Sequence, residues 1–124
     1  MYLKLNDDRP IFIQLAEGIE DGILSKAFLE ESQIPSTTEI SVNYKINPAT
    51  ALKGMNLLVD QGIIYKKRGV GMFVATGAVE KIFNKRKQSF FETYIEALYE
   101  ESEKLKLSKE DIIYPNEFAK ILED

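Results

Sequence analysis

Two groups of side chains near the middle of the sequence are of the types that contact nucleic acids. The first is a basic run of Lys66, Lys67 and Arg68, which is followed by Gly69. The second occupies one face of a predicted helix and comprises Ala49, Thr50, Lys53 and Asn56. Cations favour contact with phosphates, and small, hydroxyl and amide side chains can approach base edges without a desolvation conflict. The chemistry to expect is therefore binding to double-stranded DNA.

The residue types that carry most enzyme chemistry are missing. The 124 residues include no histidine and no cysteine, so the commonest general base, the commonest metal ligand and the thiolate nucleophile are all absent. Carboxylates are numerous near Glu100, Glu101 and Glu103, but on a helix they indicate a solvated face. We therefore expect no catalytic residue, no metal site and no cofactor.

The length suits one domain with a small appendage. No apolar run approaches the roughly 20 residues that a membrane span needs. The sequence has acidic residues, Asp7 and Asp8, close to its first residue, which is not typical of a signal peptide. These features predict a cytoplasmic protein without a membrane partner.

The net charge of −4 is distributed unevenly along the chain. Residues 1–35 carry a net charge of −4 and residues 78–124 a net charge of −3, whereas residues 36–77 carry +3. The only positive segment therefore coincides with the candidate DNA contacts. Its cations are Lys45, Lys53, Lys66, Lys67 and Arg68.

Two helix starts follow one another closely before the basic run. Ser36 and Glu39 have the spacing of a capping box, which predicts a helix over about 37–44. Asn47 followed by Pro48 is a typical start for a second helix, over about 48–61. A first helix, over about 10–26, precedes both of them and buries an apolar face.

In the second helix we expect Ile40 and Tyr44 to be buried, with Val42 or Ile46 completing the apolar corner beside it. In the third we expect burial of Ala51, Leu52, Met55, Leu58 and Val59.

A hairpin is expected after the third helix. Gly62 supplies a left-handed end to that helix. The pattern that follows predicts two strands, over residues 63–66 and 71–75, joined by a tight turn at 67–70. Helix, turn, helix and two-stranded ribbon is the order of a winged helix-turn-helix.

Beyond Gly77 the sequence predicts a long helix over 78–107 and a capped start at Ser108. A lone helix cannot bury its many aromatic residues, and an appendage of this size is too small for a core of its own. Packing against a second copy is the expected solution, and covering the chain's own winged domain is the alternative. The candidate dimerisation residues are Phe83, Phe90, Phe91, Tyr94, Ile95 and Leu98.

The expected fold class is thus mainly α with a small β-wing (α+β). An amino-terminal winged helix-turn-helix DNA-binding domain would span residues 1–77. A short carboxyl-terminal helical dimerisation domain would span residues 78–124.

Five segments taken together resemble the GntR family of bacterial transcription regulators, in particular its short YtrA-type branch. They are residues 10–15, 34–40, 46–51, 58–64 and 68–74. The resemblance implies a homodimer that binds an inverted-repeat operator, a helical tail that dimerises, and no larger effector-binding domain. Genes for ABC transporters are typical targets in that branch.

Carried over residue by residue, the resemblance implies DNA contacts at the starts of the second and third helices and a wing shaped by glycine. These positions are Ser36, Thr38, Asn47, Pro48, Ala49, Thr50, Lys53, Arg68, Gly69 and Gly71. Thr38 stands where the family usually has arginine, and Ala49 where it often has arginine or asparagine. An arginine that contacts a base or phosphate typically supplies about 1–3 kcal/mol, so its replacement predicts either weak DNA binding or an unusual operator.

Two functions follow from these patterns. The first is a homodimeric repressor that binds its operator and performs no catalysis. The second is a winged-helix protein-interaction module that has lost DNA binding, which the replaced arginines and the acidic flanks favour. No small-molecule effector is indicated.

Overall fold

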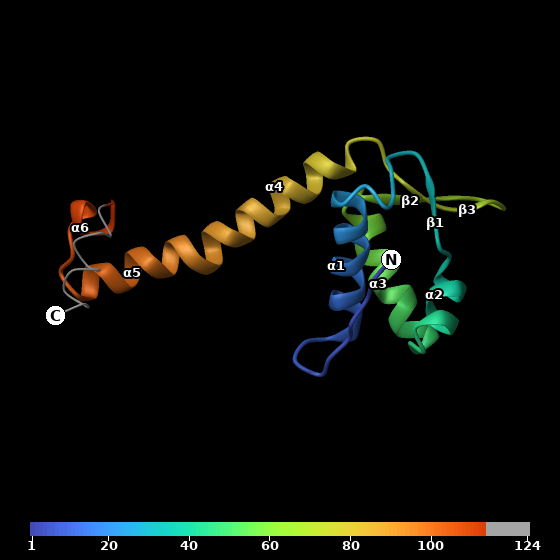
Figure 1. Cartoon of the computed structure of the whole chain (residues 1–124), viewed down its shortest axis with the longest axis horizontal. Coiled ribbons are helices and arrows are strands. Elements are labelled where there is room, and N and C mark those ends of the chain that lie inside the picture. The colour runs from blue at the N-terminus through green and yellow to red at the C-terminus, as the bar shows by residue number, and fades with distance from the viewer. Residues whose placement is uncertain (114–124) are drawn as a thin grey trace. The chain divides into compact units, whose positions relative to one another are not determined.

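The computed structural model describes residues 1–113 (Figure 1). It is mostly helical with one small antiparallel sheet, which confirms the expected fold class. Its elements are α1 (Ile11–Leu24), β1 (Gln33–Ile34), α2 (Thr37–Asn43), α3 (Pro48–Asp60), β2 (Ile64–Lys67), β3 (Gly71–Val74), α4 (Ala78–Phe90), the π-helical turn η1 (Phe91–Ile95), α5 (Glu96–Lys104) and α6 (Lys109–Ile113). The chain divides into two compact units, Met1–Asn84 and Lys85–Asp124.

The helix starts are formed by the side chains that the sequence indicated. Ser36 Oγ accepts a hydrogen bond from the Glu39 N–H at 3.0 Å, and Glu39 Oε1 accepts one from the Ser36 N–H at 3.4 Å. Asn47 Oδ1 accepts from the Ala49 N–H at 2.8 Å, and Pro48 is the first residue of α3. These bonds satisfy donors that a helix start otherwise leaves free. Both predicted caps are confirmed.

The core of the first unit lies where α1 and α2 pack on α3, and it continues under the sheet and the start of α4. Of the two candidates for the corner beside α2, Ile46 is buried and Val42 is 70% exposed. Two hydrogen bonds of Ser41 explain why Ile46 is the buried residue. The Ser41 Oγ donates to the Ile46 carbonyl at 2.7 Å, and the Ser41 carbonyl accepts from the Ile46 N–H at 3.0 Å. These bonds fold the chain back so that Ile46 enters the core.

The expected burial of Leu52 is wrong, because this side chain is 50% exposed. The buried arc of α3 is formed by Ala51, Gly54, Met55 and Leu58, which face α1, α2 and the sheet. Successive helical residues are rotated by about 100°, so Leu52 lies beyond one edge of this arc. Leu52 therefore belongs to the outer face of α3.

The expected two-stranded ribbon is a three-stranded sheet with the order β1-β3-β2. The short extended segment before Pro35 forms an edge strand, in which Gln33 pairs with Phe73 and Ile34 with Met72. The sequence signal was incomplete because a strand of two residues has no measurable alternation. The third strand connects the approach to α2 with the hairpin.

Helix α1 ends at Leu24, two residues earlier than expected, and Lys26 has a left-handed φ of 67°. Its two interior glycines are explained by close neighbours. A Cβ on Gly22 would lie 2.7 Å from the Phe28 ring, and one on Gly18 would lie 2.7 Å from Leu3. Small side chains at these positions let the turn after α1 and the amino-terminal arm lie against the helix.

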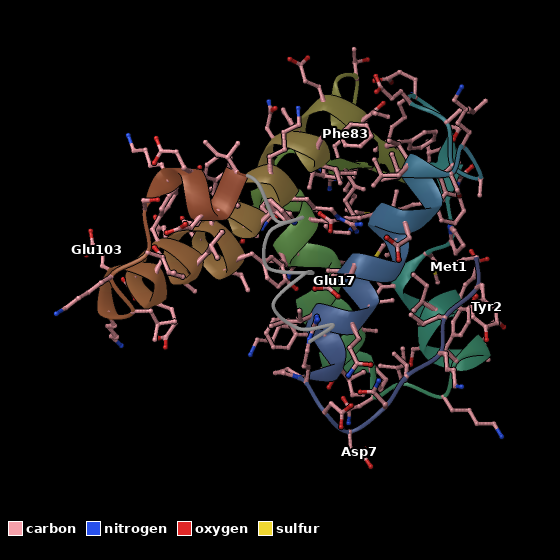
Figure 2. All side chains as sticks on the ribbon, turned by 60° about the vertical axis from the view of Figure 1, so that its left-hand side comes forward. Met1, Tyr2, Asp7, Glu17, Phe83 and Glu103 are labelled. Carbon is pink, nitrogen blue, oxygen red and sulfur yellow. The ribbon has the colours of Figure 1, made fainter. Side chains whose placement is uncertain are left out.

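The amino-terminal arm, residues 1–5, packs on the helices of the first unit. Figure 2 labels Met1 and Tyr2 at its beginning and Glu17 on α1. The Tyr44 hydroxyl, at the end of α2, donates to the Met1 carbonyl at 2.8 Å. The arm therefore joins α1 to the end of α2.

The helix expected over 78–107 is present from Ala78 to Lys104, so it is shorter than expected, and it contains one π-helical turn. A π-helical turn, η1, separates α4 from α5, and α5 ends at Lys104. The capping box predicted at Ser108 is confirmed, since Asp111 accepts from the Ser108 N–H at 2.8 Å and donates its N–H to Ser108 Oγ at 3.2 Å. Residues 114–124 of the expected dimerisation domain lie outside the described residues. Within residues 1–113, no helix is long and apolar enough to cross a bilayer.

Candidate nucleic-acid interface

The connection between α2 and α3 gathers several of the predicted DNA contacts. Thr38 is exposed in the first turn of α2, and Lys45 is exposed at a left-handed φ of 53° between the helices. Ser36 and Asn47 are occupied as caps, although a hydroxyl or amide hydrogen remains available for a further bond. In Figure 1 this connection and the β2–β3 tip project on the same side of the first unit, away from α1.

The outer face of α3 carries an exposed stripe with helical spacing. Ala49, Leu52, Lys53 and Asn56 are exposed, whereas Thr50 is half-buried. The stripe borders a shallow groove of about 420 Å³ that reaches α1. The groove is lined by Phe12, Ala49, Leu52, Lys53, Asn56, Leu57 and Asp60.

Lys53 is directed by an aromatic ring of another helix. Its Nζ lies 4.2 Å from the centroid of the Phe12 ring on α1. A cation over a ring face is attracted by the ring quadrupole, typically by about 0.5–1 kcal/mol at an exposed site. Lys53 therefore lies at the α1 edge of the stripe, a contact that the sequence did not indicate.

The hairpin tip carries the predicted basic run, but its cations do not share one face. Side chains alternate along a strand, so Lys66 and Lys67 of β2 point to opposite sides of the sheet. Lys67 Nζ lies 4.8 Å from the centroid of the Phe73 ring. Arg68 and Gly69 form the exposed turn, in which the Val70 N–H donates to the Lys67 carbonyl at 2.9 Å. The wing thus presents cations on both sides and at its tip.

Gln33 of β1 fastens the wing tip, a role that the sequence did not predict. Its Nε2 donates to the Val70 carbonyl at 3.0 Å. The same amide lies over Gly71, where an added Cβ would be 2.5 Å from Nε2. A single amide 37 residues earlier in the chain gives no local signal of this contact. The wing is therefore held at its tip as well as along its strands.

Replacing Gly71 with alanine is expected to destabilise the protein by about 2 kcal/mol. Gly71 has a φ of 143°, which disfavours any other residue, and the new Cβ would displace Gln33. Gly69→Ala is the matched control, because Gly69 has a φ of 76° and nothing within 4 Å of its Cβ position. It should cost only the backbone strain, about 1 kcal/mol. Urea unfolding of both variants measures the difference, and equal destabilisation would contradict the role given to Gln33.

Glu31 ties the base of the wing to the residue that precedes Gly77. Its Oε2 accepts from the Tyr65 hydroxyl at 2.6 Å, and its Oε1 accepts from the Thr76 N–H at 3.0 Å and the Thr76 hydroxyl at 2.7 Å. The Tyr65 ring stacks on Phe73, with centroids 5.8 Å apart. The bonds from Tyr65 and then Thr76 lower the pKa of Glu31, and the bond to Glu31 raises the pKa of Tyr65.

These shifts predict a pH dependence at both extremes. Because the pKa of Glu31 is lower in the folded state, its contribution to stability is complete above its ordinary pKa of 4.5 and is lost as the pH falls through the folded value. The contribution of Tyr65 is complete below its ordinary pKa of 10.0 and is lost as the pH rises through its raised value. Glu31→Gln should therefore flatten the acid limb of a Tm–pH profile, whereas the exposed control Glu103→Gln should not. An unchanged acid limb in Glu31→Gln would exclude this network as its source.

The preceding residue, Glu30, supports the start of α4. Its Oε1 accepts from the Gly77 N–H at 2.7 Å, and its Oε2 accepts from the Val79 N–H at 3.3 Å. A carboxylate at a helix start also interacts favourably with the helix dipole. Both acidic side chains of this loop are thus engaged with protein donors, at the base of the wing and at the start of α4.

The predicted dimerisation side chains are open to solvent in the single chain. Tyr94, Phe91, Phe90, Phe83 and Leu98 are between 44% and 62% exposed, and Ile95 is half-buried. Figure 2 labels Phe83 on α4. The rings of Phe90 and Tyr94 contact each other, with centroids 5.4 Å apart. This set is called the aromatic stripe below.

No protein-family model matches the sequence. The chain is 31% identical to a protein described as a transcriptional regulator of the GntR family from Bacteroides thetaiotaomicron, whose crystal structure superposes with a TM-score of 0.73 over 92% of this chain and 99% of that one. A GntR family transcriptional regulator from Listeria monocytogenes is 26% identical, with a TM-score of 0.70 over 88% and 94% of the two chains. The helix-turn-helix-type transcriptional regulator YhcF of Bacillus subtilis is 26% identical over 110 residues, which are 89% of each chain.

A further likeness concerns a structure that contains DNA. The DNA-binding domain of AraR, solved in complex with the operator ORX1, is 26% identical and superposes with a TM-score of 0.55. The match covers 60% of this chain and 96% of that domain.

Proposed function

Because the chain belongs to the GntR family of transcriptional regulators, we propose that it is a sequence-specific DNA-binding regulator that acts as a homodimeric repressor at an inverted-repeat operator. The observation that carries this proposal is the pairing of the exposed α3 stripe with a cationic wing tip in one winged-helix unit. The likeness to the AraR domain bound to its operator supports it. The contacts would be made by the residues predicted at α2, α3 and the wing.

The proposed mechanism is occupation of a promoter. In a twofold dimer, two α3 helices would enter successive major grooves about 34–36 Å apart, while the wings contact the flanking backbone. Residues 1–77 would bind DNA and residues 78–124 would dimerise, with the aromatic stripe buried between the copies. Blocking a promoter needs no cofactor and no catalysis. The regulator would act in the cytoplasm. An ABC transporter operon, as in the YtrA-type branch, is the proposed kind of target.

Replacing Lys67 and Arg68 with alanine together is expected to weaken binding to all DNA sequences and to flatten its salt dependence. Removing one cation that neutralises a phosphate should reduce the slope of log K against log salt by about 0.9. Fluorescence anisotropy from about 50 to 300 mM salt measures the slope. The matched control is Lys104→Ala with Lys109→Ala, which removes two exposed cations from α5 and α6.

An unchanged slope in the wing variant would contradict the role of the hairpin tip. Absence of any DNA binding by the unaltered protein at low salt would contradict the proposed function itself. In that case the winged unit would serve as a protein-interaction module.

A further inference from the structure

Leu52 is an apolar side chain at the centre of the stripe proposed to face DNA. It is 50% exposed, and it lies one turn from the exposed Ala49 and one turn from the exposed Asn56. All three line the same shallow groove on the outer face of α3. An exposed leucine in such a position is not needed for the core, because Ala51, Gly54, Met55 and Leu58 already fill the inner face.

The same helix lacks the side chains that usually recognise G·C pairs. Helix α3 contains no arginine, and its one lysine, Lys53, lies over the Phe12 ring at the edge of the stripe. Guanine is most often recognised by arginine or lysine at O6 and N7. The centre of the stripe therefore offers two aliphatic groups and one amide.

These groups match one kind of base pair in the major groove. Thymine alone presents a C5-methyl group there, and aliphatic side chains contact it. Adenine presents the N6 donor and N7 acceptor that an amide such as that of Asn56 can bind in a bidentate manner. Nearby cations favour a polyanionic occupant over an apolar protein surface, because residues 36–77 carry a net +3.

We propose that the half-site contacted by α3 consists of A·T pairs, and that Leu52 recognises a thymine methyl group. This inference rests on the proposed function, since it assigns the base preference of the same surface. Leu52, with Ala49 beside it, covers thymine methyls, and Asn56 binds an adjacent adenine.

The test starts with selection of sites from random duplex DNA by the full chain at about 150 mM salt. The recovered half-site should hold A·T pairs at its centre. Each thymine is then replaced in turn by deoxyuridine, which removes only the methyl group. One of these replacements should weaken binding about fourfold, the value for one buried methyl-sized group. In Leu52→Ala the same replacement should have no effect.

The control is Val42→Ala, which shortens an exposed aliphatic side chain of α2 outside the groove and should keep the deoxyuridine effect. Equal binding of thymine and uracil sites by the unaltered protein would overturn the inference. So would a G·C centre in the selected half-site, or a deoxyuridine effect that persists in Leu52→Ala. These results leave DNA binding itself intact, whereas failure to select any DNA would instead refute the proposed function.

Discussion

Replacing Phe91 and Tyr94 together with glutamate is expected to convert the proposed dimer into monomers and to weaken operator binding by about 100-fold or more. Both side chains are exposed in the single chain, Phe91 to 57% and Tyr94 to 62%. The fold of the single chain therefore loses little when they change. A dimer that buries them would have to bury four added carboxylates, which is costly without partners.

The weaker binding follows from linkage between half-sites. In a dimer the second half-site is bound intramolecularly, which typically strengthens binding by a factor of roughly 10² to 10⁴. Sedimentation velocity measures the mass, and anisotropy with one-half-site and two-half-site duplexes measures the affinity. The variant should bind both duplexes almost equally, as a monomer does.

A charge added elsewhere provides the control. Leu29 is 59% exposed in the loop after α1, so Leu29→Glu should leave both mass and affinity unchanged. Sedimentation of the Phe91 and Tyr94 variant as a dimer would refute the aromatic stripe as the contact between copies. Sedimentation of the unaltered protein as a monomer at micromolar concentration would refute the proposed dimer.

Replacing Gly54 with valine is expected to destabilise the first unit by about 3 kcal/mol. Gly54 lies where α3 crosses α1, and an added Cβ would be 2.8 Å from the backbone oxygen of Phe12 and 3.1 Å from Leu15 Cδ2. A backbone oxygen cannot move without its helix, so the two helices must separate. Overpacking of this kind typically costs about 1–3 kcal/mol, and the backbone contact places Gly54→Val at the upper end of this range.

Gly18→Val is the matched control within α1. The nearest atom to its Cβ position is Leu3 Cδ1 at 2.7 Å, the end of a flexible side chain in the amino-terminal arm. This neighbour can rotate away, so the expected destabilisation is about 1 kcal/mol. Thermal unfolding by circular dichroism compares the two variants. Equal stability of both would show that the crossing of α1 and α3 tolerates a wider separation.

Local sequence rules were sufficient for the helix starts and for the order of the elements. Ser36, Asn47 and Ser108 each carry the chemistry of a cap within three residues, so no distant contact is needed to place them. Gly62 ends α3 with a φ of 71°, as its conformational freedom predicted. The wing followed from two strands separated by a short turn.

Features that depend on distant residues were not predictable in the same way. Gln33 reaches Val70 across 37 residues, and Glu30 reaches Val79 across 49. Leu52 was misassigned because hydrophobicity alone does not tell which edge of a helix meets its neighbours. The predicted DNA contacts at Thr38, Lys45 and Lys53 lie on the outside of the first unit, and their role in binding stays a prediction.

The two adjacent glutamates of the loop after α1 hold two different elements of the fold, the hairpin and α4. Glu31 holds Tyr65 at the root of the hairpin, and its neighbour Glu30 holds the first turn of α4. A displacement of the first turn of α4 would also displace the loop that contains Glu30 and Glu31, and this loop contacts the hairpin through Tyr65. Because a single peptide unit separates the two carboxylates, a change in its backbone dihedral angles would displace both contacts together.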